Sequence, residues 1–192
     1  TLYPEDSDDQ DTLIKNADAA MYRAKELGRN SYQFYTPEMN ARAQELLGME
    51  NSLRRALERG EFLLYFQPKA SVASGEIVGA EALLRWNHPE RGMVPPSAFI
   101  PVMEETGLIV PAGEWVLKAV SRQIQAWKAA GLRPVPVAVN LSARQFLSKN
   151  LGPAIERILE EHGIDPGLIE LEITESSLMT NTEEAIITLE YL

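Results

Sequence analysis

The stretch GAEALLRWNHPERG, from Gly79 to Gly92, decides how the chain folds. Its first half predicts a β-strand, in which successive side chains point to opposite faces. Glu81, Leu83 and Arg85 then share one face, and small or apolar residues share the other. Burying a carboxylate and a guanidinium together is unfavourable unless something compensates their charges. A metal ion bound by Glu81 and a phosphate held by Arg85 would compensate them, whereas a plain ion pair is the simpler alternative.

The bulk composition limits the classes of function. The chain has 192 residues, of which 45% are hydrophobic and 24% charged, as is typical of soluble globular proteins. Its net charge of −10 argues against DNA or RNA as a partner. With no cysteine, it has no disulfide, thiolate zinc site or cysteine nucleophile. No apolar run approaches the roughly 18 residues of a membrane span, so we expect a cytoplasmic location. A longer parent protein could still be tethered to a membrane through segments outside this sequence.

From Glu61 onward the sequence alternates between strand and helix patterns. Strands are predicted over residues 62–69, 76–86, 135–141 and 169–174, and helices across residues 96–130 and over residues 151–162. This alternation predicts an α/β fold with a parallel sheet or a β/α barrel. A capping box of Thr180 with Glu183 is expected to start the last helix.

The first sixty residues have a different pattern. Apolar residues at helical spacing predict a helix that ends near Gly28, and a second helix that ends at Gly60. Between them, residues 31–35 alternate aromatic and polar side chains like a short strand. We place a domain boundary near Thr36. The chain begins without methionine and stops inside a helical pattern, so we expect it to be a fragment of a longer protein.

Two later strands repeat the arrangement of an oxygen ligand opposite aliphatic residues. Asn140 and Glu172 each lie toward the carboxyl end of their strand, as does Glu81, and this is where β/α barrels hold their active sites. Two carboxylates and an amide oxygen form a ligand set suited to Mg²⁺ or Mn²⁺. Glu170 shares the face of Glu172, but its position nearer the start of the strand favours a structural role.

Four segments then carry a specific resemblance. EALLRW, PPSAFIPVMEETGLI, VAVNLSARQF and LEITES resemble the successive motifs of EAL-domain cyclic-di-GMP phosphodiesterases, in the order of that family. NADAAMYRAKELGRNSYQFY resembles the C-terminal end of a GGDEF diguanylate cyclase domain. The resemblance divides the chain into a GGDEF tail (1–36), a linker helix (37–60) and the N-terminal half of an EAL domain (61–192). It implies a TIM-like (β/α) barrel of EAL type, of which about the first half is present.

The resemblance also implies a chemistry. The family hydrolyses one phosphodiester of cyclic-di-GMP to give linear pGpG, with Mg²⁺ or Mn²⁺ as cofactor. Glu81, Asn140 and Glu172 match the positions of the family's catalytic metal ligands. Metal ions would activate the attacking water and neutralise charge on the transferring phosphoryl group.

Other matched positions imply substrate binding and assembly. Gln67, Leu83 and Arg85 would bind the dinucleotide, with Arg85 at a phosphate. Glu175 would stabilise the loop that organises the second metal position and the contacts of a homodimer. The family's later aspartate pair and lysine would lie beyond Leu192, so we expect the fragment alone to be inactive. The alternatives are a non-catalytic cyclic-di-GMP receptor and a regulatory dimerisation module.

Overall fold

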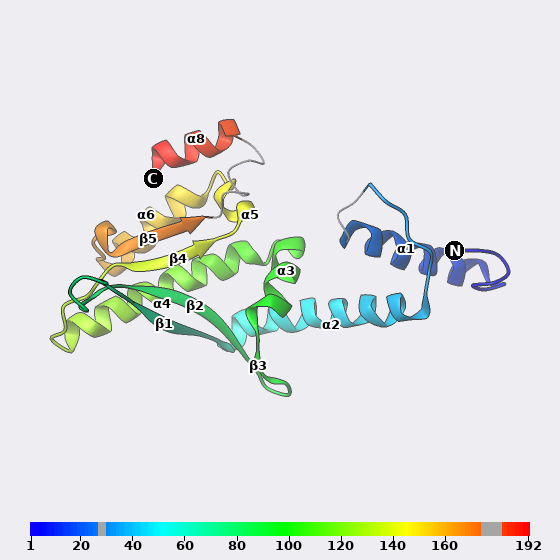
Figure 1. Ribbon diagram of the computed structural model, residues 1–192, viewed down its shortest axis with the longest axis horizontal. Coiled ribbons are helices and arrows are strands. Elements are labelled where there is room, and N and C mark those ends of the chain that lie inside the picture. Colours follow the sequence, from blue (N-terminus) through cyan, green and yellow to red (C-terminus); the bar gives the residue numbers. More distant parts are fainter. Residues whose placement is uncertain (27–29, 174–181) are drawn as a thin grey trace. The chain divides into compact units, whose positions relative to one another are not determined.

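A computed structural model describes residues 1–26, 30–173 and 182–192 (Figure 1). Contacts within the chain separate two compact units, Thr1–Ser52 and Leu53–Leu192. The long helix α2 (Pro37–Arg59) contributes residues to both.

The N-terminal unit contains α1 (Gln10–Glu26) and most of α2. The Asp9 carboxylate accepts hydrogen bonds from the backbone N–H and the hydroxyl of Thr12, at 2.8 and 2.7 Å. These bonds lower the pKa of Asp9 and occupy a free backbone donor at the start of the helix. The Asn40 amide donates to Asn16 Oδ1 and to the Tyr35 hydroxyl, each at 2.8 Å. Asn16 is only 2% exposed, so this bond joins α2 to the buried side of α1.

The short strand predicted over residues 31–35 is wrong. These residues form irregular chain, and all the strands that the structure describes belong to the C-terminal unit. Tyr32 and Phe34 are 79% and 62% exposed and contact each other edge to face, with 5.6 Å between ring centroids. An alternating pattern forms a stable strand only when a neighbouring strand pairs with its backbone, and no described strand does so here.

The C-terminal unit is built on one mixed sheet. Its strands are β1 (Phe62–Ala70), β2 (Ile77–His88), β3 (Gly92–Val94), β4 (Val137–Leu141) and β5 (Ile169–Ile173). Among the described residues they run in the order β1-β2-β4-β5, with β3 paired to β2 (Figure 1). β2, β4 and β5 are mutually parallel, whereas β1 and β3 are antiparallel to β2.

The prediction of a parallel sheet is therefore right for β2, β4 and β5 and wrong for β1. A short turn from Ser71 to Glu76 joins β1 to β2, and such a connection permits only antiparallel pairing. β3 was not predicted, because the segment after β2 contains proline and reads as a loop. His88 Nδ1 accepts the backbone N–H groups of Glu90 and Arg91, at 3.1 and 3.2 Å, and so closes a tight turn that returns the chain as β3.

Helices follow the strands and cover one face of the sheet. They are α3 (Pro96–Thr106), α4 (Ile109–Ala129), α5 (Ala143–Phe146), α6 (Leu151–His162), the short 3₁₀ turn η1 (Pro166–Leu168) and α8 (Thr182–Tyr191). Val137 and Val139 of β4 are buried with Val120 and Ile124 of α4 and Ile158 of α6. The predicted aliphatic face is confirmed as the core side of the sheet. It follows that the opposite face carries the polar side chains.

The helix ends agree with the glycine signals. α6 ends at His162, and Gly163 follows it with φ +57°, a left-handed conformation that favours glycine. Gly131 likewise adopts a left-handed conformation after the end of α4, with φ +74°. The predicted capping box before α8 lies outside the residues whose side chains are described. No described helix is both long and apolar enough to cross a membrane.

Candidate active site

Register places four of the predicted site residues on one face of the sheet. Gln67 of β1 lies opposite Glu81 of β2, and Asn140 of β4 lies opposite Glu172 of β5. Glu81 is opposite Ala138, which precedes Asn140 by two positions on the same face. All four side chains therefore point away from the α4 and α6 side. The parallel direction of β2, β4 and β5 brings the three predicted metal ligands to one region of that face.

Glu81 and Asn140 are in direct contact. The Asn140 side-chain N–H donates to Glu81 Oε1 at 2.8 Å. With its N–H directed to the carboxylate, the amide keeps its oxygen as an acceptor. The two residues thus present carboxylate and amide oxygens at the junction of β2 and β4.

Glu172 has a different partner. Its carboxylate forms an ion pair with the ammonium of Lys69 on β1, at 2.6 Å, and Glu170 lies 3.3 Å from the same nitrogen. The hydrogen bond to Glu172 is the main cause that raises the pKa of Lys69 above its ordinary value. Glu170 and Glu172 thus share one lysine, and Glu172 is neutralised by it in place of standing free beside Glu81 and Asn140.

These residues fit a hard cation in their chemistry. Among the described residues, no group of three His, Cys, Asp or Glu side chains converges into a ready metal cluster. The set of Glu81, Asn140 and Glu172 includes an amide, and all its donors are oxygens, as Mg²⁺ and Mn²⁺ prefer. A positive charge, the ammonium of Lys69, already lies against Glu172. The face therefore stabilises a cation at this position.

Arg85 is held apart from Glu81. The two side chains start about 13 Å apart, because they are four residues apart on an extended strand. The Arg85 guanidinium lies over the Tyr65 ring, 5.5 Å from its centroid, and donates to the Leu84 carbonyl at 2.9 Å. The plain Glu81–Arg85 ion pair is thus not formed between these two described residues. A guanidinium in a cation–π contact keeps most of its N–H donors available for an anion.

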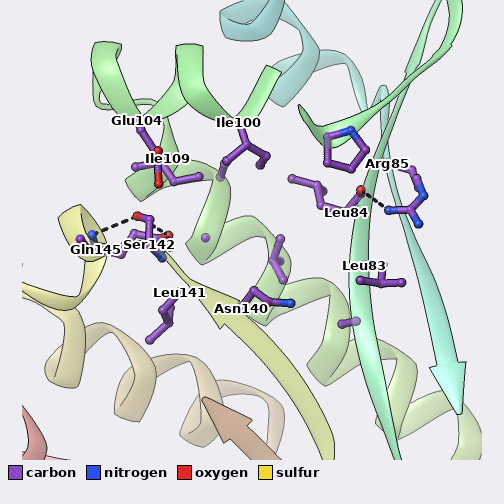
Figure 2. A pocket seen from close by; sticks show the side chains of 16 residues that line it. Leu83, Leu84, Arg85, Ile100, Glu104, Ile109, Asn140, Leu141, Ser142 and Gln145 are labelled. Atoms are coloured by element: carbon purple, nitrogen blue, oxygen red, sulfur yellow. Dashed lines mark hydrogen bonds between the residues drawn. The ribbon is translucent and has the colours of Figure 1, made fainter. Parts of the chain in front are cut away.

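A cavity of about 620 Å³ opens at the carboxyl ends of β2 and β4. Its walls come from these strands and from α3, α4 and α5, and they are mainly aliphatic. Figure 2 shows Leu84 and Ile100 facing each other across it, Asn140 extending from β4 toward β2, and Arg85 directed away from its centre. Leu83, one of the predicted substrate-binding residues, also lines the cavity, whereas Gln67 is not among its lining residues.

One wall of the cavity is fixed by a helix cap. Ser142 and Gln145 form the capping box of α5: the Gln145 carboxamide oxygen accepts from the Ser142 backbone N–H at 3.0 Å, and Ser142 Oγ accepts from the Gln145 backbone N–H at 3.3 Å. Gln145 is 5% exposed and lies against Gly113 of α4, where a Cβ would overlap its Nε2. The missing side chain at Gly113 therefore makes room for the residue that holds the Asn140–Ser142 segment.

Replacing Gly113 by alanine should lower the free energy of unfolding by about 1–2 kcal/mol, because overpacking outweighs the better helix propensity of alanine. Urea unfolding followed by circular dichroism measures this change. Gly48 of α2 is the matched control, since it has nothing within 4 Å of a Cβ. Gly48→Ala should stabilise by up to about 1 kcal/mol. Equal effects of the two substitutions would contradict the role of Gly113.

Sequence reasoning missed two residues of this face, Lys69 and Tyr65. Both alternate with Gln67 along β1, so the period of two that placed Gln67 beside Glu81 could also have identified them. Glu104 of α3 also lines the cavity. Glu175 lies outside the described residues.

Comparison with known proteins identifies the fold. The family model described as EAL domain matches residues 50–192, which is most of the chain. The chain belongs to the EAL domain family. Over its whole length it is 45% identical to the bifunctional diguanylate cyclase/cyclic di-GMP phosphodiesterase MucR of Pseudomonas aeruginosa. It is 44% identical to the cyclic di-GMP phosphodiesterase PdeR of Escherichia coli, with 96% of the chain covered. The chain spans 28% of the length of each of these two relatives.

Solved structures agree with this EAL assignment. The PaMucR phosphodiesterase in complex with c-di-GMP matches with a TM-score of 0.71 and 41% identity, over 74% of this chain and 58% of that one. The EAL enzyme Bd1971, in a form bound to cAMP and cyclic-di-GMP, matches with a TM-score of 0.71 and 27% identity, over 97% of this chain and 49% of that one. This EAL domain therefore has the mixed sheet and covering helices of its structural relatives.

Proposed function

We propose that this EAL domain takes part in the metal-dependent hydrolysis of cyclic-di-GMP to linear pGpG. The observation that carries the proposal is the meeting of Glu81 with Asn140 at 2.8 Å, with Glu172 in register beside Asn140 on parallel strands. The names of MucR and PdeR, and the c-di-GMP held by the PaMucR structure, support the choice of substrate.

Three residues of the polar face would bind the metal ion in the proposed reaction. Glu81, Asn140 and Glu172 would hold Mg²⁺ or Mn²⁺. Such an ion supplies a low-pKa water and neutralises phosphoryl charge when it is bound. Glu81 accepts a hydrogen bond from the Asn140 amide, and this bond orients the two side chains relative to each other.

Substrate binding would use the neighbouring positions. The Arg85 guanidinium, steadied by the ring of Tyr65, would contact a phosphate of the dinucleotide. Leu83 lies at the cavity and would contact a base or ribose, and Gln67 lies beside Glu81 across the hairpin. A rigid arginine that donates N–H groups to two phosphate oxygens restricts the orientation of the diester.

We further propose that the chain is part of a longer GGDEF–EAL protein. Residues 1–36 would be the tail of a GGDEF domain, residues 37–60 a linker helix, and residues 61–192 the first half of a TIM-like EAL barrel. The description of MucR as bifunctional supports this organisation. Glu175 would stabilise the loop that organises the second metal position and the contacts of a homodimer, and the location would be cytoplasmic.

The full-length protein should require a divalent ion. Purified protein treated with EDTA should leave cyclic-di-GMP intact, and added Mn²⁺ or Mg²⁺ should restore its conversion to pGpG, because the oxygen ligands need a hard cation to act on phosphate. Chromatography of the nucleotides measures the conversion. Turnover that persists in EDTA after metal analysis shows no bound ion would contradict the proposal.

A cyclic-di-GMP receptor is the second candidate function. It is favoured by the Lys69–Glu172 ion pair, which neutralises the acidic face without a metal ion. Tight binding of cyclic-di-GMP by the full-length protein, with no pGpG formed at any concentration of Mn²⁺, would identify a receptor.

A further inference from the structure

Lys69 crosses the sheet to reach its partners. It starts on β1, and β2 and β4 lie between it and the glutamates of β5. Its register partner is Gly79, and a Cβ at Gly79 would lie 3.5 Å from Lys69 Cδ and 3.7 Å from Lys69 Cβ. The aliphatic stem of the lysine thus passes over a glycine. Ala138, on the same face of β4, is small and fully buried. Small residues on the two intervening strands leave room for a long side chain above them.

The ammonium ends at the two carboxylates of β5. It lies 2.6 Å from Glu172 Oε1 and 3.3 Å from Glu170 Oε2. Glu170 and Glu172 alternate along one strand and so project on the same side, where two carboxylates repel each other. Arg85, the other cation of this face, is occupied by Tyr65 and Leu84. Lys69 is therefore the cation that neutralises the β5 carboxylates in the part of the chain that the structure describes.

We propose that Lys69 is the resident counter-ion of Glu172, and that a divalent ion binds by displacing its ammonium from this carboxylate. The inference rests on the proposed function, since it takes Glu172 as a metal ligand. In the exchange the lysine keeps its proton and its charge, and its head moves from the carboxylate toward solvent. No covalent bond changes.

The exchange sets the strength of metal binding. A divalent ion must compete with a positive charge that is already paired, so the affinity of the site is lower than its carboxylates alone would give. The three side chains are 36–51% exposed, so a water-like dielectric applies. In such a medium, a unit charge a few ångströms from a divalent ion changes its affinity by about tenfold.

The test is a titration of the full-length protein with Mn²⁺ in the absence of nucleotide. Free Mn²⁺ is measured by electron paramagnetic resonance, and calorimetry confirms the dissociation constant. The variants are Lys69→Met, which removes the charge and keeps the apolar stem, and Lys69→Arg, which keeps the charge. Lys128→Met, on an exposed position near the end of α4, is the matched control for net charge.

Lys69→Met should bind Mn²⁺ about tenfold more tightly than the wild type. Lys69→Arg and Lys128→Met should stay within about twofold of it, because the first retains the local charge and the second removes a remote, screened one. A Mn²⁺ affinity in Lys69→Met that is unchanged or weaker would overturn the inference. If Lys69→Met does not fold, as judged by circular dichroism, Lys69→Gln serves in its place with the same expected direction.

A fourth variant separates this inference from the proposed function. If Glu81→Gln weakens Mn²⁺ binding while Lys69→Met leaves it unchanged, only the counter-ion role of Lys69 is wrong. If Glu81→Gln and the wild type bind Mn²⁺ equally, or neither binds it, the metal site itself is wrong and the inference falls with it.

Discussion

Glu81→Gln is expected to lower the rate of cyclic-di-GMP hydrolysis by the full-length protein about a thousandfold, the upper range for loss of one charge-stabilising group from an active site. Glutamine has nearly the same shape, so the strand is preserved. It lacks the negative charge that strengthens binding of a divalent ion. Its single amide oxygen can still accept from the Asn140 N–H₂, but an N–H₂ group then replaces the second carboxylate oxygen, which is the one left for the ion.

Initial rates at saturating Mn²⁺ measure this effect. Glu76→Gln is the matched control. Glu76 is exposed and lies just before β2, so its substitution removes the same charge at a position away from the site. It should leave the rate unchanged. Circular dichroism and thermal unfolding should show that both variants fold. Turnover of Glu81→Gln at the rate of Glu76→Gln would remove Glu81 from the proposed metal ligands.

Trp86→Ala is expected to lower the free energy of unfolding by about 3–5 kcal/mol, as is typical of a fully buried large aromatic residue. Trp86 is 1% exposed. Its ring lies 6.2 Å from that of Phe62 and 5.8 Å from that of Phe99, between centroids. Its indole N–H donates to Glu61 Oε2 at 3.1 Å, so truncation also takes a donor from this carboxylate.

Urea unfolding followed by tryptophan fluorescence and circular dichroism measures the loss. Trp127→Ala is the comparison, because Trp127 is only partly buried. Its ring centroid lies 5.3 Å from that of Phe66. It should cost about 1–2 kcal/mol, in proportion to the smaller apolar area that it buries. Equal losses of unfolding free energy in the two variants would show that the aromatic contacts of Trp86 do not stabilise the fold more than those of Trp127.

The sequence predicted most elements of the C-terminal unit because each has a strong local signal. The helix predicted over residues 151–162 agrees with α6, and the glycine after it ends the helix as expected. The strand predicted over residues 76–86 agrees with β2, and its aliphatic face is in the core. Signals of this kind depend on the backbone period and on residues close in sequence.

What failed depends on partners that are far away in sequence. The alternation over residues 31–35 has no neighbouring strand among the described residues, so it forms no ladder there. The candidate site shows the same limit. Spacing placed Glu172 and Asn140 on one face, and the register agrees. It could not show that Lys69 reaches Glu172 over Gly79, since that contact depends on the order of the strands and on the curvature of the sheet.

The alternation along β2 restricts how this strand can change during evolution. Glu81 faces the site and Ala82 faces the core, and each is aligned with a fixed partner on β4. Insertion or deletion of a single residue before Glu81 would reverse both faces at once, placing the carboxylate in the core and an alanine in the site. Substitutions can adjust β2 one face at a time, but its length cannot drift. We expect changes in length to be tolerated only in the turns on either side, because they leave the alternation along β2 intact.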